Sequence, residues 1–180
     1  SSHGMLDVSA GVAFSFKASQ SRMSANDAII INAGAAFYHF NKPKKSFYGS
    51  TDPLSPKLIA NLDGLIPFEG TNISLLPSAL FAFQGKNDEI VAGTLVKYQI
   101  KEGSKYTGFE KESAISIGGH YRFGDALIVS ALLEMAYFGI GLSYDVNLSG
   151  LTAATKSRGG FEFSFRYIIP KATVYGTKRM

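Results

Sequence analysis

The sequence predicts an all-β protein: an antiparallel meander of about eight to ten strands that closes fully or partly as a barrel. The clearest observation is strict alternation near the end of the chain. Every even position from Ala136 to Leu148 is apolar, and from Gly159 to Ile169 the pattern recurs with Phe or Tyr at each odd position from 161 to 167. A period of two indicates extended strands with two unlike faces.

The second face of these strands is unusual. It carries glycine, serine and single charges of both signs, whereas a strand that faces open water is normally rich in Lys, Glu and Thr. This mixture is typical of the crowded polar interior of a small barrel. The apolar face would then point outward into a lipid bilayer, which predicts an outer-membrane-type β-barrel.

Composition agrees with one domain of this kind. The chain has 180 residues, enough for a sizeable core, and only 18% of them are charged, below the ~25% of typical soluble domains. No stretch approaches the ~20 consecutive apolar residues of a membrane helix. A membrane β-barrel would not show one, because alternation averages its hydropathy away.

Charge and cysteine content exclude several function classes. The net charge is +4 with scattered basic residues, so no basic stripe indicates nucleic-acid binding. There is no cysteine, and therefore no disulfide framework, thiolate metal site or cysteine nucleophile. No cofactor is expected.

The ends of the chain are set apart from the barrel domain, which we expect to span residues 6–169. Residues 1–5 read as the remnant of an expression tag, and residues 170–180 as a basic C-terminal tail. If residues 1–5 are vector sequence, the natural protein has been truncated before Leu6.

Alternation and short apolar runs place the strands in order. They are expected at residues 6–17, 28–40, 57–67, 73–84, 90–101, 113–123, 126–148 and 159–169. Asp63-Gly64 is able to break the third, Pro77 favours an edge position or a bulge for the fourth, and a break in alternation near Glu134 indicates a turn or bulge. Asn41 to Pro56 is the longest irregular stretch.

A set of ordered motifs resembles a known family. They are Phe40-Asn41-Lys42-Pro43, Ser46-Phe47-Tyr48-Gly49, Leu76-Pro77-Ser78-Ala79-Leu80, Gln84-Gly85-Lys86, Gly93 to Tyr98, Tyr121-Arg122, Asp125-Ala126, Gly141 to Asn147, and Arg158-Gly159-Gly160-Phe161-Glu162. Their order and spacing over roughly residues 36–169 resemble the PorP/SprF family of the Bacteroidetes type IX secretion system.

The resemblance implies a β-barrel in the cell outer membrane that takes part in protein secretion or gliding motility. It implies no enzymatic activity and no catalytic residues. The partners it implies are other type IX secretion components or an exported adhesin, besides the lipid bilayer. Members of the family are generally longer, with further strands before this region, so the chain resembles a C-terminal portion.

Four charged residues are candidates for a polar network in the barrel lumen: Arg122, Asp145, Glu162 and Arg166. They lie on the polar faces of neighbouring predicted strands, and charges in a narrow lumen must pair. We expect each arginine to lie near a carboxylate, with Asp145 and Glu162 as the leading partners. A role in guiding a substrate through a pore is the alternative.

The stretch from Asn41 to Pro56 is the candidate partner-binding loop. Its basic and aromatic residues are Lys42, Lys44, Lys45, Phe47 and Tyr48, a combination suited to a contact patch. A solvated connection with no binding role is the simpler alternative.

No catalytic or metal site is expected. His39 and His120 belong to no cluster of ligands, and Gly139-Ile140-Gly141 is followed by no helix that would make it a phosphate loop. The main alternative to the secretion role is a soluble or periplasmic lipocalin-like barrel, in which the Phe-rich face lines a cavity. A lipid-modifying enzyme would need Ser, His and Asn to converge, which the sequence does not reveal.

Overall fold

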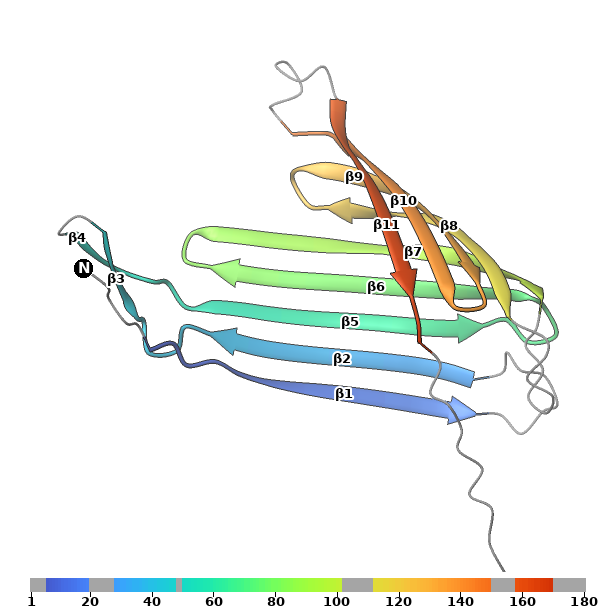
Figure 1. Cartoon of the computed structure of the whole chain (residues 1–180), viewed down its shortest axis with the longest axis horizontal. Coiled ribbons are helices and arrows are strands. Elements are labelled where there is room, and N and C mark those ends of the chain that lie inside the picture. The colour runs from blue at the N-terminus through green and yellow to red at the C-terminus, as the bar shows by residue number, and fades with distance from the viewer. Residues whose placement is uncertain (1–5, 20–27, 48–49, 102–111, 150–157, 170–180) are drawn as a thin grey trace, which may run out of the picture.

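The computed structural model describes residues 6–19, 28–47, 50–101, 112–149 and 158–169, and these form an all-β structure (Figure 1). One antiparallel sheet has nine strands in the order β1-β2-β5-β6-β7-β8-β9-β10-β11, and β3 pairs with β4 in a separate hairpin. The two outermost strands of the large sheet, β1 and β11, are not paired with each other. The predicted meander is confirmed, as a partial barrel.

The strand bounds follow the alternation closely. They are β1 Ala10–Ser19, β2 Ala28–Tyr38, β3 Lys44–Phe47, β4 Ser50–Pro53, β5 Lys57–Pro67, β6 Ile73–Gln84, β7 Asn87–Lys101, β8 Ser113–Arg122, β9 Ala126–Met135, β10 Phe138–Asn147 and β11 Arg158–Tyr167. The stretch expected to be irregular between Asn41 and Pro56 thus contains the β3–β4 hairpin.

The antiparallel register gives the sheet two rims. We call the rim that carries β3 and β4 the hairpin rim; the turns from β6 to β7 and from β8 to β9 lie there too. The opposite rim carries the links from β5 to β6 and from β9 to β10. In Figure 1 the strands from β8 onward swing across the direction of β1 to β7, which gives the sheet its curl.

Of two expected breaks, the one at Asp63-Gly64 is absent and the turn expected near Glu134 is present. Asp63 and Gly64 do not interrupt β5, which runs through both. Glu134 is part of β9, and the turn comes after it at Ala136, whose φ of 53° is unusual for a residue other than glycine. Residues 126–148 therefore form two strands rather than one bent strand.

The expectation that Pro77 marks an edge strand or a bulge is wrong. Pro77 lies in β6, which has β5 on one side and β7 on the other, and it pairs in register with Thr94 of β7. On the β5 side the recorded pairing lapses between Asp63↔Ser78 and Ile66↔Leu75. Because proline has no N–H, this lapse lets a central strand accommodate it.

The most buried residues lie on one side of the sheet. Ala114, Ser116 and Ala126 are fully buried, and Ser74 and Gln99 nearly so. Many large apolar side chains are exposed instead, among them Phe14 at 63% and Phe163 at 62%. In the described part of the chain no helix is long and apolar enough to cross a membrane.

Candidate functional site

The strand register divides the sheet into two continuous faces. Positions in register with Leu142 carry Val, Leu, Ile, Phe, Tyr and small residues across all nine strands. In the described strands, charged residues share this register only at strand ends: Asp88, Lys101 and Arg158. The opposite face carries Lys17, Lys57, Asp63, Glu89, Lys97, Arg122, Glu134, Asp145, Glu162 and Arg166.

The charged face is the concave one. Neighbouring strands lie about 4.8 Å apart, so side chains two strands apart meet most readily where the sheet curves toward them. Such contacts occur on the charged face from β7 to β9, from β8 to β10 and from β9 to β11. The apolar face, with its exposed aromatic residues, is therefore convex. The predicted apolar surface shared by β10 and β11 is confirmed, with Ile140 opposite Phe165 and Leu142 opposite Phe163.

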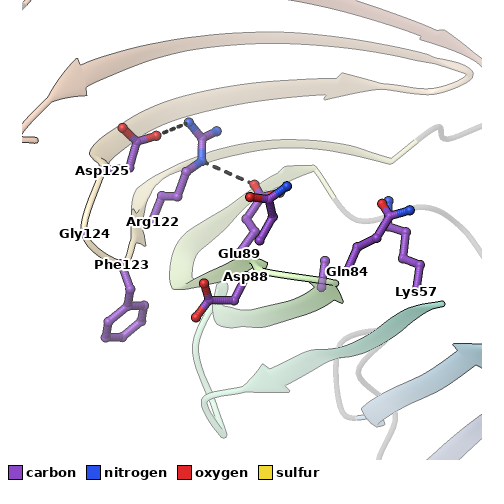
Figure 2. Close-up of a pocket in the computed structure, with 10 residues that line it drawn as sticks. Lys57, Gln84, Asp88, Glu89, Arg122, Phe123, Gly124 and Asp125 are labelled. Atoms are coloured by element: carbon purple, nitrogen blue, oxygen red, sulfur yellow. Dashed lines mark hydrogen bonds and ion pairs between the residues drawn. The ribbon is translucent and has the colours of Figure 1, made fainter. Parts of the chain in front are cut away.

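Arg122 is the centre of a charge cluster at the hairpin rim. Its Nη1 lies 3.2 Å from Asp125 Oδ2 and 3.3 Å from Asp145 Oδ2, and its Nε lies 3.4 Å from Glu89 Oε1. The side chain of Asp145 is 15% exposed and those of Glu89 and Asp125 are about half exposed. One guanidinium thus joins β7, β8, β10 and the turn after β8, as Figure 2 shows for Glu89 and Asp125.

A cavity of about 610 Å³ opens beside this cluster. Figure 2 shows Arg122 and Asp125 on one side of it and Lys57 with Gln84 on the other. Asp88 and Glu89 add two further carboxylates to its lining. The lining of this cavity at the hairpin rim is largely polar or charged, so the cavity offers no apolar chamber for a lipid-like ligand.

Glu134 is the centre of a second cluster, toward the opposite rim. Its carboxylate accepts from Arg166 Nη2 at 2.7 Å and lies 2.9 Å from Lys97 Nζ. Lys97 is largely buried, with 13% of its side chain exposed, and it also lies 3.8 Å from Glu112. This one carboxylate holds β7, β9 and β11 together.

The four residues expected in the lumen network are thus divided between contacts. Arg122 lies against Asp145 as expected, whereas Arg166 contacts Glu134 rather than Asp145 or Glu162. Glu162 lies 3.5 Å from the Ser143 hydroxyl. Glu134, Glu89 and Lys97 were not among the expected network residues. The concave faces of β9 and β7 do not differ sharply in sequence from the convex faces of the same strands. If the alternation of β10 is extended to the neighbouring strand β9, Glu134 falls opposite Gly139. It then lies on the same face as Arg122 and Arg166.

A row of mostly polar residues crosses the concave face, with Gly93 and Ile128 as its two nonpolar members. In direct register it runs Ser15, Asn32, Asp63, Ser78, Gly93, His120, Ile128 and Asp145. Ser15 Oγ donates to Asn32 Oδ1 at 2.7 Å, and Asn61 Nδ2 donates to Asp63 Oδ2 at 3.0 Å. The row places small hydrogen-bonding groups where a narrow interior leaves room for little else.

Gly93 lets His120 reach across one strand. Ser78 Oγ and His120 Nε2 share a hydrogen bond of 2.7 Å, although β7 lies between their strands. A Cβ on Gly93 would lie 2.7 Å from His120 Cδ2 and 2.5 Å from its Cα. A catalytic histidine is oriented by a third group; among the described residues the side-chain hydrogen bond of His120 is the one with Ser78.

The base of the rim hairpin is tied to the segment that precedes β1. Asp7 Oδ2 lies 2.8 Å from His39 Nδ1, and Asn41 Nδ2 donates to the Leu6 carbonyl at 2.8 Å. His39 therefore has an acidic neighbour rather than a metal site. In the described part of the chain no group of three or more His, Cys, Asp or Glu side chains is placed to hold a metal ion.

The structure places the candidate partner-binding residues at the hairpin rim. Lys42 and Lys44 are exposed, and Pro43 beside them is buried, with its carbonyl accepting from Leu54 N at 2.9 Å. Lys45 and Phe47 lie in β3, paired by backbone with Asp52 and Ser50. Tyr48 lies outside the described residues.

A family model described as "Type IX secretion system membrane protein PorP/SprF" matches residues 1–167. The chain belongs to the PorP/SprF family. It is therefore a membrane component of the type IX secretion system. A convex face free of charge between the strand ends and a concave face that carries the charges agree with a membrane location. No curated protein and no solved structure gives a significant match to the chain.

Proposed function

We propose that this PorP/SprF chain forms part of the wall of an outer-membrane β-barrel and works without catalysis, by binding exported cargo or other type IX secretion components. The observation that carries the proposal is the division of the sheet into a convex apolar face and a concave ion-paired face. In a membrane barrel the lipid-facing side is apolar and the lumen is polar.

Aromatic residues near both rims support a lipid-facing convex side. Tyr121 packs against Phe123 near the hairpin rim, and Phe138 packs against Tyr167 at the opposite rim, each with ring centroids 5.0 Å apart. Aromatic girdles at the two membrane–water interfaces are typical of membrane barrels. The band between them is where we expect hydrocarbon contact.

The lipocalin-like alternative requires the opposite facing. A ligand-carrying barrel lines its interior with apolar side chains, whereas Phe163 and Phe165 share the convex register here. The purified chain should therefore need detergent or lipid to remain monodisperse. A stable monomer in plain buffer that takes up an apolar ligand would favour the lipocalin-like function.

The lumen residues have a structural role in this proposal. Arg122 with Asp145, and Arg166 with Glu134, join strands that are not direct neighbours. Such pairs fix the curvature of the wall and neutralise charge in the interior. Glu162 remains available at the edge of the same face.

The binding surface that we propose is the β3–β4 hairpin with Lys42, Lys44, Lys45, Phe47 and Tyr48. The hairpin forms its own small sheet beyond the ends of β2 and β5, so it lies at a rim that a partner can reach. Its base is fixed by Asn41 and His39, which keeps the hairpin placed relative to the wall.

Charge reversal tests this surface in the full-length protein in cells. Lys42→Glu, Lys44→Glu and Lys45→Glu together, or deletion of residues 44–51, should leave the protein inserted but weaken secretion of type IX cargo or co-purification of another secretion component. Lys86→Glu, in the β6–β7 turn at the same rim, is the matched control and should have little effect. Normal secretion and co-purification with the triple variant would refute the hairpin assignment.

The non-catalytic assignment has its own test. Ser78→Ala and His120→Gln each remove the Ser–His hydrogen bond that the described residues form on the concave face. Secretion should be retained in proportion to the amount of folded protein. A hydrolytic activity of the purified protein that either change abolishes would overturn the assignment.

A further inference from the structure

The cavity beside Arg122 is formed by enclosed strands of the large sheet. Its lining comes from β5, β6, β7, β8 and the turn after β8, and each of these four strands has a neighbour on both sides. Its volume of about 610 Å³ lies within the range of ligand sites, about 300–1,000 Å³. We call it the rim cavity, and its two walls carry opposite charge (Figure 2).

One wall of the rim cavity carries a lysine without an ion pair. Lys57, Gln84 and Asn87 stand in direct register across β5, β6 and β7. Gln84 Nε2 donates to the Ser55 carbonyl at 3.3 Å. Lys57 is half-buried and forms no ion pair with another described residue. A partly desolvated ammonium group is stabilised by a negative charge beside it, so this wall favours a carboxylate of a ligand.

The opposite wall carries more negative than positive charge. Arg122 lies against three carboxylates, those of Glu89, Asp125 and Asp145, so a single guanidinium does not neutralise them. The side chains of Glu89 and Asp125 are about half exposed, and both line the rim cavity. An incoming ligand can therefore reach these two carboxylates, and this wall favours a cationic group.

Backbone hydrogen bonds hold the acidic wall in place. Phe123 N donates to the Ile90 carbonyl at 2.9 Å, which fixes the start of the turn after β8 against β7. The Asp125 carbonyl accepts from Leu148 N at 2.7 Å. Gly124 between them has a φ of 76°, a conformation that glycine adopts without strain. A wall that is already ordered loses little conformational entropy when a ligand binds.

Other classes of ligand match only one of the two walls. A lone anion would be repelled by the carboxylates, and a lone cation by Lys57. The described residues place no group of three or more His, Cys, Asp or Glu side chains to hold a metal ion. A ligand that carries a carboxylate and a cationic group satisfies both walls at once.

We propose that the rim cavity binds a short polypeptide segment of both charges, with an acidic side chain toward Lys57 and a basic side chain toward Glu89 and Asp125. A single amino acid would leave much of the volume empty, whereas a segment of a partner or exported protein can enter from the hairpin rim. The inference rests on the proposed binding role and adds a second contact to it, separate from the hairpin.

The experiment measures peptide binding to the full chain in micelles of a nonionic detergent. The probe is the peptide Gly-Asp-Gly-Arg-Gly with an uncharged dye on its amino end and an amide at its carboxyl end, so its two side chains are its only charges. Residues two apart share one face of an extended segment. In one matched peptide asparagine replaces the aspartate, and in the other glutamine replaces the arginine. Fluorescence anisotropy gives the affinities.

The bipolar peptide should bind about two- to fivefold more tightly than either matched peptide, which is the range of one exposed ion pair. Lys57→Gln should remove the preference for aspartate and keep that for arginine, and Glu89→Gln should do the reverse. Ala82→Leu adds bulk to the lining without changing a charge and should weaken binding of the bipolar peptide. Lys86→Gln, at the same rim but outside the lining, is the matched control and should change neither preference.

Three results would overturn the proposal. The first is equal affinity for the three peptides, or no binding of any of them. The second is an equal effect of Lys86→Gln and Lys57→Gln, which would indicate general surface charge. The third is displacement of the peptide by an equal concentration of free arginine, which would indicate a small solute as the ligand. The hairpin is tested by secretion in cells and the rim cavity by peptide binding in micelles, so either proposal can fail without the other.

Discussion

The concave face is built differently at its two ends. In β6 to β11 polar side chains reach across an intervening strand, as Ser78 does to His120 and Glu134 to Arg166. In β1, β2 and β5 the recorded contacts join adjacent strands, as Ser15 does to Asn32, or residues of one strand, as Asn61 does to Asp63. We call these regions the bridged region (β6 to β11) and the unbridged region (β1, β2 and β5).

The difference connects side-chain length to curvature. Two strands that flank a third are about 10 Å apart in a flat sheet, so long or branched polar groups must lean together over a concave surface to meet. Small residues suffice where the sheet is flatter, and Gly11, Ala13, Gly34 and Ala36 line the unbridged region. Charge pairs therefore mark where the wall bends most, and the predictions below test this relation.

The largest effect is expected on the convex face, where the two regions should behave alike. Ile140→Arg in the bridged region and Ile31→Arg in the unbridged region should each reduce the free energy of unfolding in lipid vesicles by about 2–4 kcal/mol. The reason is that both arginines would face hydrocarbon. Urea titration in vesicles measures this. Ser143→Thr, on the concave face, is the mild control, and equal tolerance of all three would contradict the assigned facing.

Removing the carboxylate of Glu134, which Lys97 and Arg166 share, should cost more stability than a matched change in the unbridged region. Glu134→Gln leaves Lys97 and Arg166 without their common partner, and we expect a loss of about 1.5–3 kcal/mol in the free energy of unfolding. Asp63→Asn in the unbridged region keeps an acceptor for Asn61 and should cost less than about 1 kcal/mol. The same vesicle titration compares them, and the relation fails if the costs are equal.

A methyl group at two glycines gives a finer comparison. Gly93→Ala places Cβ against the Cα of His120, a backbone atom that cannot yield easily, and should cost about 1–3 kcal/mol. Gly34→Ala meets the amide oxygen of Asn61 at 2.5 Å, the end of a side chain that can turn away, so its cost should be lower. Unfolding titrations are the measurement, and a larger penalty at Gly34 would be the contradictory result.

The smallest effect is expected at the hairpin rim. Asp125 is one of three carboxylates around Arg122, and its side chain is 46% exposed. Asp125→Asn should change the free energy of unfolding by only about 0.2–1 kcal/mol, because solvent weakens such pairs. Raising the salt concentration should narrow the difference between variant and parent. If Asp125→Asn costs as much free energy of unfolding as Glu134→Gln, solvent exposure does not determine how much each ion pair contributes.

Sequence reasoning was most successful where one face of a strand is uniformly apolar. The alternation of β10 and β11 predicted both their facing and their pairing. A shift by one residue would move the Phe and Leu side chains to the polar face, so only one register keeps all of them on the apolar face. In β9 both faces are largely apolar, so Glu134 could be assigned to the concave face only through its neighbours. The partner of Arg166 depends on which strands lie two apart in the curved sheet, and no local pattern encodes that.

The rim also illustrates what local patterns omit. Pro43, Pro53 and Pro56 suggested an irregular stretch, yet β3 and β4 pair through Lys44↔Pro53, since a proline at the end of an isolated two-stranded hairpin leaves the other pairs intact. The Asp7–His39 contact joins residues far apart in sequence. His39 stands alone in the sequence, and no local pattern there predicts its contact with Asp7.

The lapse beside Pro77 has a kinetic consequence. Between Asp63 and Ile66 the recorded pairing of β5 with β6 is interrupted, while β6 and β7 stay paired through the same level. The boundary between the unbridged and bridged regions thus has a weak point in the middle of the sheet. Gly64 and Leu65 stay paired with Ile31 and Ile30 of β2, so of their two amide protons the one that points toward β6 should exchange with deuterium early, before the amide protons that join β6 to β7. The wall should begin to separate there rather than at either rim.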